Sequence, residues 1–415
     1  MTSQRASVAA SLVAVLLGVV PCFAQPSPTS IPAGTALTFR MLDAVASDDD
    51  ASARVLRATL MSPIIRDGVT AVAPGASAYA HIVRAGTDSA RRHVLRISFD
   101  SATLNGVVTP LAARVTAVDN AREVVDTTGL ITGPPSGRTL RNKRTWALMA
   151  FGVVHPIAAA ALFGASKVRA HERESEIRYA AGTDFATVTT EPLVIANAST
   201  PHVWRPILPA DSLQRIVRSW PVNTEAEAGR VGADLLNVAL LGDSATILDA
   251  LHAAGWDSAK PMSFSADLAT FFRAAQDRGY SHQPVSTLLM NGQRPSLVFE
   301  RVTNTFAKRH HVRLWHWTTA LDGSAVWLAS ASHDVAIAFL RDRRHFTHRI
   351  DPAVDHERDK LTDDLWAAGC IDARSDVRRT LPTNLFVNDG HDPIVTDGTL
   401  IVLRLREPCV SGRSR

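Results

Sequence analysis

The sequence predicts a multidomain protein with an N-terminal small all-β barrel or sandwich, a central apolar helical segment, and a C-terminal α+β domain with a mixed sheet and flanking helices. Three observations indicate this organisation: evenly spaced strand-like runs over residues 31–120, an apolar stretch over Thr145–Ser166, and alternating helical and strand-like patterns over residues 200–406. A length of 415 residues suits two or three domains of ~100–200 residues each. With 46% hydrophobic and 20% charged residues, the chain favours packed cores over disorder.

Residues 1–24 have the pattern of a cleavable secretory signal peptide. Arg5 supplies a positive charge before an apolar run from Val8 to Val20, and small residues follow near the end of the segment. The run is shorter than the ~20 apolar residues that a membrane-spanning helix needs. Cys22 also permits a lipoprotein interpretation, but Pro21 stands before it, where such sites carry a small residue. We therefore expect plain cleavage and export to the periplasm or cell envelope.

The strand-like runs of residues 31–120 are separated by turn signals. Asn105-Gly106 is the best hairpin tip, because this dipeptide adopts positive φ at low cost. Such even spacing is typical of a small barrel or sandwich, and no cluster of polar residues in it points to chemistry. The expected strands are Leu37–Leu42, Val55–Met61, Ala78–Arg84, His93–Phe99 and Leu111–Val118.

A short string near the start of this domain, Pro32–Thr35, returns in similar form as Ala180–Thr183. Two copies of four residues are weak evidence for a repeat, and Gly-Thr opening a strand twice explains them equally well. Either interpretation predicts a strand after each string.

Thr145–Ser166 is long enough to cross a bilayer as a helix, but three features count against that. His155-Pro156 interrupts its hydrogen bonding, many of its residues are alanine or glycine, and basic residues lie on both flanks. A stop-transfer helix after a signal peptide carries its positive excess on the far side only. A buried or membrane-surface helical hairpin is therefore favoured, with a membrane-spanning helix as the open alternative.

From about residue 200 the pattern is mixed, which predicts a sheet with helices on one face. Three helices are expected: Asp243–Ala254, a second from the N-cap residue Ser265 to Gly279, and Pro352–Ala368. The expected strands are Asp234–Leu241, 285–290, 296–302, 309–317, 324–331, 334–340 and Thr399–Arg406.

Several unusual strings of this half occur in one order: Leu235-Leu236-Asn237, Leu240-Leu241-Gly242-Asp243, Ala253-Ala254-Gly255-Trp256, Arg309-His310-His311-Val312-Arg313-Leu314-Trp315, Thr347-His348-Arg349-Ile350-Asp351-Pro352, and then Asp355, Glu357, Arg358 and Asp359. Together they resemble the LssY C-terminal domain family over about residues 200–406. The resemblance implies no established reaction and no catalytic residues. In some members this domain follows a membrane-embedded type 2 phosphatidic acid phosphatase. Here Pro135-Ser136-Gly137 is similar to one motif of that enzyme, but Arg138 stands where its histidine should be, so lipid phosphatase activity is not implied.

The strand expected over 309–317 offers the first candidate site. Alternation places His311, Arg313, Trp315 and Trp317 on one face and His310, Val312, Leu314 and His316 on the other. If Val312 and Leu314 pack inward, His311 and Arg313 line an open face that suits a phosphate, a carboxylate or a planar group. An amphipathic edge strand with its arginine stacked on tryptophan is the open alternative.

The spacing His348-x-x-Asp351-x-x-x-Asp355 offers the second candidate site, a metal site. A loop imidazole and two carboxylates at a helix start could converge on one divalent metal ion, and this donor set suits zinc, manganese or iron. The competing interpretation is structural. Asp351 before Pro352 is a good N-cap, and Asp355 can pair with Arg358 on the helix surface.

Cys370 and Cys409 are the cysteines that remain after signal cleavage. An exported protein can join them in a disulfide, and two separate buried thiols are the alternative. The chain has no C-x-x-C pattern of a redox or zinc site.

Two functional hypotheses follow. The first is an exported binding or interaction module, whose partner is an envelope component or anionic lipid head groups. A net charge of +4 without a long single-sign run does not indicate a nucleic-acid partner. The second is a metal-dependent hydrolase acting on a phosphorylated or acidic envelope substrate. Its candidate residues are His311 and His348 as ligand or base, Asp351 and Asp355 as metal ligands, and Arg313 with Arg358 as an anion clamp.

Overall fold

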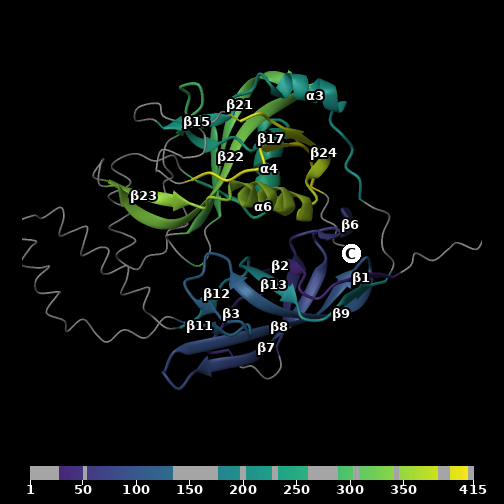
Figure 1. Cartoon of the computed structure of the whole chain (residues 1–415), viewed down its shortest axis with the longest axis vertical. Coiled ribbons are helices and arrows are strands. Elements are labelled where there is room, and N and C mark those ends of the chain that lie inside the picture. Colours follow the sequence, from purple (N-terminus) through teal and green to yellow (C-terminus); the bar gives the residue numbers. More distant parts are fainter. Residues whose placement is uncertain are drawn as a thin grey trace, which may run out of the picture.

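The computed structural model describes residues 28–49, 54–133, 176–196, 202–226, 232–259, 288–301, 304, 308–340, 345–381 and 393–409, without the side chains of 318–319, 336–340 and 345–348. The described chain is mostly β and forms two units, a closed barrel below and a mixed-sheet domain above it in Figure 1. The signal peptide expected over 1–24 and the helix expected over 265–279 lie outside the described residues. So does the apolar segment Thr145–Ser166, which therefore finds no support here.

The N-terminal unit is a barrel rather than a sandwich. Its antiparallel strands follow the order β8-β7-β4-β2-β13-β9, and β9 pairs with β8 to close the ring. The five strands expected for this region are confirmed, within a few residues at each end. The barrel strands are β2 (Ala36–Met41), β4 (Val55–Leu60), β7 (Ser77–Thr87), β8 (His93–Leu104), β9 (Val107–Val118) and β13 (Asp184–Thr189).

Short strand pairs decorate the barrel. They are β1 (Thr29–Ile31) with β14 (Leu193–Ile195), β3 (Val45–Ala46) with β12 (Arg178–Tyr179), β5 (Ile64–Arg66) with β6 (Val69–Val72), and β10 (Val124–Val125) with β11 (Ile131–Thr132). Strands β12 to β14 lie beyond the range 31–120 expected for this domain, so the chain returns to the barrel after residue 133.

The repeated Gly-Thr string marks the two ends of one strand pair. β2 and β13 run antiparallel, and a glycine with positive φ precedes each of them, Gly34 at +85° and Gly182 at +93°. The Gly34 N–H donates to the carbonyl of Thr189 (2.7 Å), and the Gly182 N–H donates to that of Met41 (2.8 Å). Each string thus forms a turn before its own strand and is hydrogen bonded to the end of the partner strand. Glycine suits this turn because it adopts the left-handed backbone conformation without strain.

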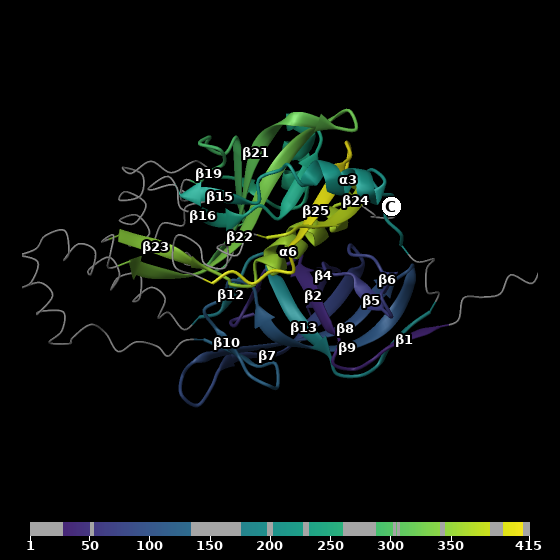
Figure 2. The same ribbon diagram turned by 45° about the horizontal axis from the view of Figure 1, so that its top comes forward.

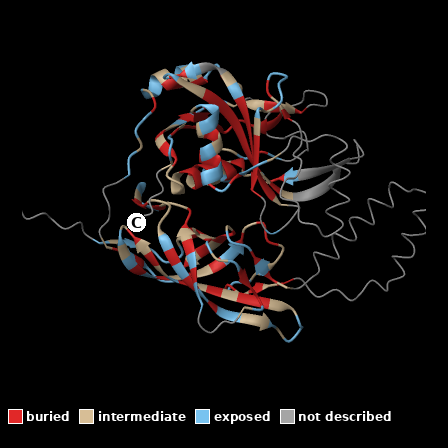
Figure 3. Cartoon of the chain, turned by 180° about the vertical axis from the view of Figure 1, so that it is seen from behind, coloured by how far each residue is buried: buried red, intermediate tan, exposed pale blue. Residues whose placement is uncertain are grey.

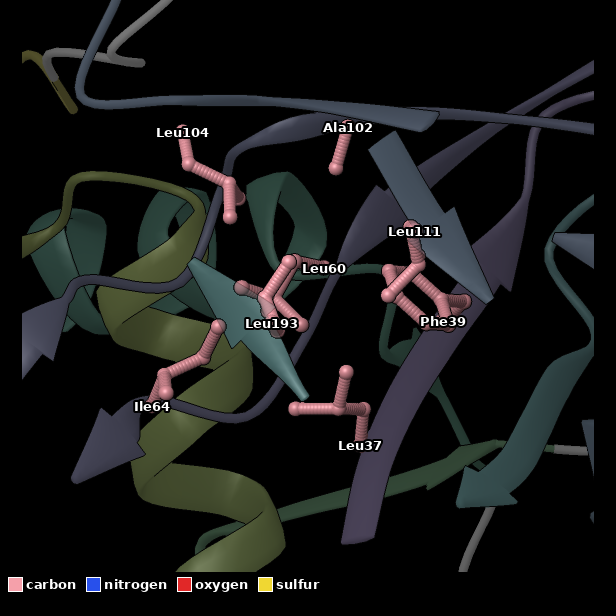
Figure 4. A pocket seen from close by; sticks show the side chains of 8 residues that line it. All are labelled: Leu37, Phe39, Leu60, Ile64, Ala102, Leu104, Leu111 and Leu193. Carbon is pink, nitrogen blue, oxygen red and sulfur yellow. The ribbon is translucent and has the colours of Figure 1, made fainter. Parts of the chain in front are cut away.

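The barrel interior is a packed apolar core. Phe39 and Phe99 stack inside it with ring centroids 4.5 Å apart. Figure 4 shows eight apolar side chains from different strands converging there, and the space they enclose is too small for a water molecule. Side chains fill this region, so it does not form a ligand-binding cavity.

The C-terminal domain is built on a mixed sheet, as expected. β17 (Val238–Leu241) runs parallel to β25 (Thr399–Leu405), and the other neighbours are antiparallel. The order is β18 (Asp257–Ser258), β20 (Leu297–Arg301), β21 (Arg309–Leu321), β22 (Ser324–Leu340), β17, β25 and β24 (Ile371–Arg378), and β23 (His345–Ile350) pairs with the end of β22. A small sheet of β16 (Gly232–Leu235), β15 (Asn223–Ala226) and β19 (Leu288–Leu289) lies beside it.

Helices cover both faces of this sheet, which corrects the expectation of one covered face. α4 (Ser244–Ala253) and α6 (Val354–Ala367) pack on the face that carries Val312 and Leu314, whereas α3 (Ala210–Val217) packs on the face of Trp315. Two of the three expected helices are therefore confirmed. Within the described ranges, no helix combines the length and apolar character that crossing a bilayer requires.

Helix α6 lies on the side of the sheet domain that faces the barrel (Figures 1 and 2). Buried residues follow the strands of both units, as the red segments of Figure 3 show. The surface between α6 and the barrel is also where buried charged residues of the two units meet.

Candidate functional site at the domain interface

Two buried carboxylates join the units. Asp184, the first residue of β13, accepts hydrogen bonds from Arg40 of β2 (2.7 and 2.9 Å) and from Lys360 of α6 (2.6 Å), and Arg301 of β20 lies 3.3 Å away. Asp364 of α6 accepts one from Arg40 (2.8 Å). Burial opposes ionisation of Asp184, but the charges of the three cations hold its pKa well below the usual value. The interface therefore contains an ion network that takes groups from both units.

A histidine pair lies beside this network. His310 of β21 and His333 of β22 are direct cross-strand partners, and their rings stack with centroids 4.3 Å apart. His310 is hydrogen bonded through Nδ1 to Glu357 of α6 (2.7 Å) and through Nε2 to Asp119, which follows β9 of the barrel (2.9 Å). His333 contacts the next barrel residue, with its Nε2 2.8 Å from Oδ1 of Asn120.

The two histidines differ in charge. Burial alone would keep His310 neutral, but the carboxylates of Glu357 and Asp119 outweigh it and raise its pKa to about 9. Burial and the charge of His310 lower the pKa of His333. Asp119, His310 and His333 each offer one ligand atom, and these three atoms lie within 4.8 Å of one another. Two imidazoles and a carboxylate form a donor set that can hold a divalent transition-metal ion.

The open face expected for His311 and Arg313 is wrong. His311 is 0% exposed and Arg313 is 4% exposed, because the sheet is covered on both sides. The Nε2 atom of His311 lies 2.7 Å from Asp334, and Arg313 pairs with Asp234 at 3.3 Å. Burial and the neighbouring arginines lower the pKa of His311 to about 3 despite Asp334. His311 is thus neutral, and its Nδ1 atom has no hydrogen-bond partner among the residues that the structure describes.

Arg358 does not meet Arg313. It lies on α6, over the face of Val312 and Leu314, whereas Arg313 points to the opposite face by strand alternation. Arg358 pairs with Asp397 (2.8 Å) and donates to the carbonyl of Thr399 (3.1 Å). The two arginines therefore do not converge on one anion in this structure.

The predicted metal set His348, Asp351 and Asp355 is placed only in part. Asp355 accepts hydrogen bonds from Thr396 Oγ1 (2.8 Å), the Asp397 N–H (2.6 Å) and Arg358 (3.1 Å). The expected pairing of Asp355 with Arg358 is therefore confirmed.

The remaining two residues of the set lie before α6. Asp351 accepts from the Ala353 N–H (3.0 Å), and Ala353 occupies the N-cap position in its place, so the N-cap expectation for Asp351 is wrong. His348 lies on β23 opposite Ile337, and its side chain is not described. The shared-metal hypothesis for these three residues stays a prediction.

Cys370 and Cys409 form a disulfide, which decides between the two alternatives for these residues. Cys370 is fully buried and belongs to the core under α4 and α6. The bridge fixes the chain after the last strand, β25, to the start of β24.

Sequence reasoning missed the interface. His310 and Glu357 enter the sequence analysis only as members of motifs, and the sequence assigns no site role to Asp119, Asp184 or His333, although His333 is one of seven histidines between residues 310 and 356. A signal was available in the polar pair His333-Asp334, which lies where the strand-like runs 324–331 and 334–340 meet: if the two runs form one buried strand, these polar residues need partners from elsewhere.

Comparison with known proteins assigns the C-terminal half. Residues 217–400 match the family model described as LssY C-terminus, whereas no curated protein matches the chain. The match contains His310, His333, Glu357 and Lys360 but begins only after the last strand of the barrel unit, β14, so the interface joins a family domain to a separate unit. Residues 217–400, somewhat less than half of the chain, thus form a LssY C-terminal domain.

Proposed function

We propose that this chain is an exported envelope protein in which the barrel and the LssY C-terminal domain act together as one binding module. The ion network around Asp184 and Asp364 carries this proposal. Its charged side chains compensate one another across the interface, so they support a fixed relative position of the two units. A fixed pair of units can present one continuous surface to a partner without the entropic cost of ordering two loose domains.

Export is supported by the signal-like segment 1–24 together with the disulfide, since such bridges persist in oxidising compartments. The test is cell fractionation followed by peptide mapping without reductant. We expect a periplasmic chain that begins near Gln25 and carries linked Cys370 and Cys409 peptides. A full-length chain in the cytoplasmic fraction, with both thiols open to alkylation, would contradict export.

The proposed partners are envelope components with anionic groups, including lipid head groups, because the sequence pI of about 9.2 gives the chain a positive charge at neutral pH. Co-sedimentation with vesicles of phosphatidylglycerol and phosphatidylethanolamine tests this. Binding that needs phosphatidylglycerol and weakens with salt supports the lipid partner. Equal recovery with neutral vesicles excludes it and leaves a protein or glycan component of the envelope.

A hydrolase acting on a phosphorylated or acidic substrate is the second candidate, and the His311–Asp334 pair favours it. A neutral imidazole that is oriented by a carboxylate, and whose other nitrogen has no partner among the residues described in the structure, has the arrangement of a general base. His311 is fully buried, however, so the binding function fits this structure better. Metal-stimulated phosphoesterase activity that is lost in His311→Gln but retained in His316→Gln would replace the binding proposal.

A further inference from the structure

We propose that Asp119, His310 and His333 form a binding site for a divalent transition-metal ion, such as Zn²⁺, that joins the barrel to the LssY C-terminal domain. The carboxylate comes from the barrel and both imidazoles come from the C-terminal sheet. These residues are distinct from the set His348, Asp351 and Asp355 that the sequence suggested.

The separation of the ligand atoms suits a small metal ion. Tetrahedral zinc, with Zn–N and Zn–O bonds of about 2.0–2.2 Å, places neighbouring ligand atoms about 3.3–3.5 Å apart. The Nε2 atom of His310 now lies 2.9 Å from Oδ2 of Asp119, and all three ligand atoms fall within 4.8 Å. An opening of about half an ångström between His310 and Asp119 would therefore admit the ion.

Glu357 prepares His310 for this role. Its Oε2 atom accepts a hydrogen bond from Nδ1 of His310 (2.7 Å), which leaves Nε2 directed at Asp119. A carboxylate behind a ligating histidine is the usual means by which proteins fix the ring orientation at a metal. His333 also directs its Nε2 atom at the barrel turn, toward Asn120.

The charge of the cluster also favours a divalent cation. Glu357 is 3% exposed, and its Oε1 atom has no hydrogen-bond partner among the described residues. An ion bound at Nε2 of His310 would replace the proton on that atom, and the carboxylates of Asp119 and Glu357 beside two imidazoles that are then neutral carry a charge of about −2, which one divalent ion neutralises. A buried carboxylate oxygen without a partner is costly unless such a cation compensates it.

The barrel turn that carries Asp119 is held in place by both units. The Asp119 N–H donates to the carbonyl of Asp184 (2.9 Å), and its own carbonyl accepts from the side chain of Asn304 (2.6 Å). Lys308 donates to the carbonyl of Ala121 (2.8 Å). The carboxylate is thus presented to the histidines before any ion arrives, which lowers the cost of assembling the site.

The test is Zn²⁺ binding by the full chain after removal of metal with a chelator. We expect about one Zn²⁺ per chain, and X-ray absorption with two imidazole nitrogens at about 2.0–2.1 Å. His333→Gln should lose this stoichiometric zinc, because the amide can still donate to Asn120 but replaces the imidazole. Glu357→Gln should keep the stoichiometry and weaken affinity about 10–100-fold, as removal of a supporting carboxylate does.

His81→Gln is the matched control, since His81 also pairs with an aspartate, Asp100, but on the exposed barrel surface. It should bind zinc like the unmodified chain. The inference is overturned if the unmodified chain takes up no stoichiometric zinc, or if its bound zinc lacks imidazole ligands. It is also overturned if zinc persists in His333→Gln but disappears in Asp355→Ala, which would favour the site suggested by the sequence.

Discussion

The Nζ atom of Lys360 lies 2.6 Å from Oδ2 of Asp184, so the middle of helix α6 is bonded to the first residue of a barrel strand. A second bond crosses in the opposite sense, from Arg40 of the barrel to Asp364 of α6 at 2.8 Å. Each unit thus supplies one cation and one carboxylate to the other. Because both carboxylates are buried, a shift of α6 along the barrel would break both bonds and leave buried charges unpaired.

These two ion pairs between the units predict that Asp184→Asn strongly lowers the stability of the folded chain. The substitution leaves Arg40, Arg301 and Lys360 short of a buried partner, and we expect the free energy of unfolding to fall by about 3–5 kcal/mol. Urea denaturation measures it. The control is Asp43→Asn, which removes a surface partner of Arg57 and should cost less than about 1 kcal/mol. Equal losses in the two variants would contradict a special role for the buried network.

The same network predicts a dependence on acid. The pKa of Asp184 is lowered in the folded chain, so its contribution to stability is complete above its ordinary value of 3.8 and is lost as the pH falls toward the folded pKa. We expect the stability difference between the unmodified chain and Asp184→Asn to be constant from pH 7 to 5 and to shrink below pH 4. A difference that stays constant down to pH 2.5 would show that ionisation of Asp184 is irrelevant.

Asp363 gives a prediction of opposite sign. Burial and the charges of Asp364 and Asp359 raise its pKa to about 8. The folded chain therefore holds a proton that the unfolded chain has released, and stability declines as the pH rises from about 4 to 8. Asp363→Asn should be more stable than the unmodified chain at pH 8 by about 1 kcal/mol or more, since one pKa unit corresponds to about 1.4 kcal/mol. Thermal melts at pH 4.5 and 8 measure this, and a variant that is less stable at pH 8 would refute it.

Reduction of the Cys370–Cys409 bridge should destabilise the C-terminal domain. The bridge closes a loop between residues 39 positions apart, and the chain-entropy model gives an effect of about 2–4 kcal/mol. Urea denaturation with and without reductant measures it. Cys409→Ser without reductant should match the reduced chain, and an unchanged midpoint in both would mean that the bridge contributes nothing to stability.

Local signals were enough for the barrel strands but not for barrel closure. Alternation and turns identify β2, β4, β7, β8 and β9, because each strand buries one face. β13 enters the same ring after a long separation in sequence, and no local pattern states which strands will pair across such a distance. The similarity of the strings around Gly34 and Gly182 was the one sequence feature that we connect with the pairing of β2 and β13.

The site was harder to predict because its polar residues serve the contact between units. Taking the Val312 and Leu314 face of the strand as core, we expected His311 on an exposed face. In the structure, α3 and the apolar residues packed with it cover the His311 face as well. Strands 324–331 and 334–340 were expected to be separate, but β22 runs through His333 and Asp334 without a break. Those residues are polar because they face partners such as Asn120 and His311, and not because the chain turns there.

Differential scanning calorimetry tests the central claim, that the barrel and the LssY C-terminal domain behave as one body. We expect a single transition for the unmodified chain, with a calorimetric enthalpy equal to the van't Hoff enthalpy. In Asp184→Asn we expect this transition to separate into two, one for each unit. Two independent transitions in the unmodified chain at neutral pH, unaltered by Asp184→Asn, would contradict the account.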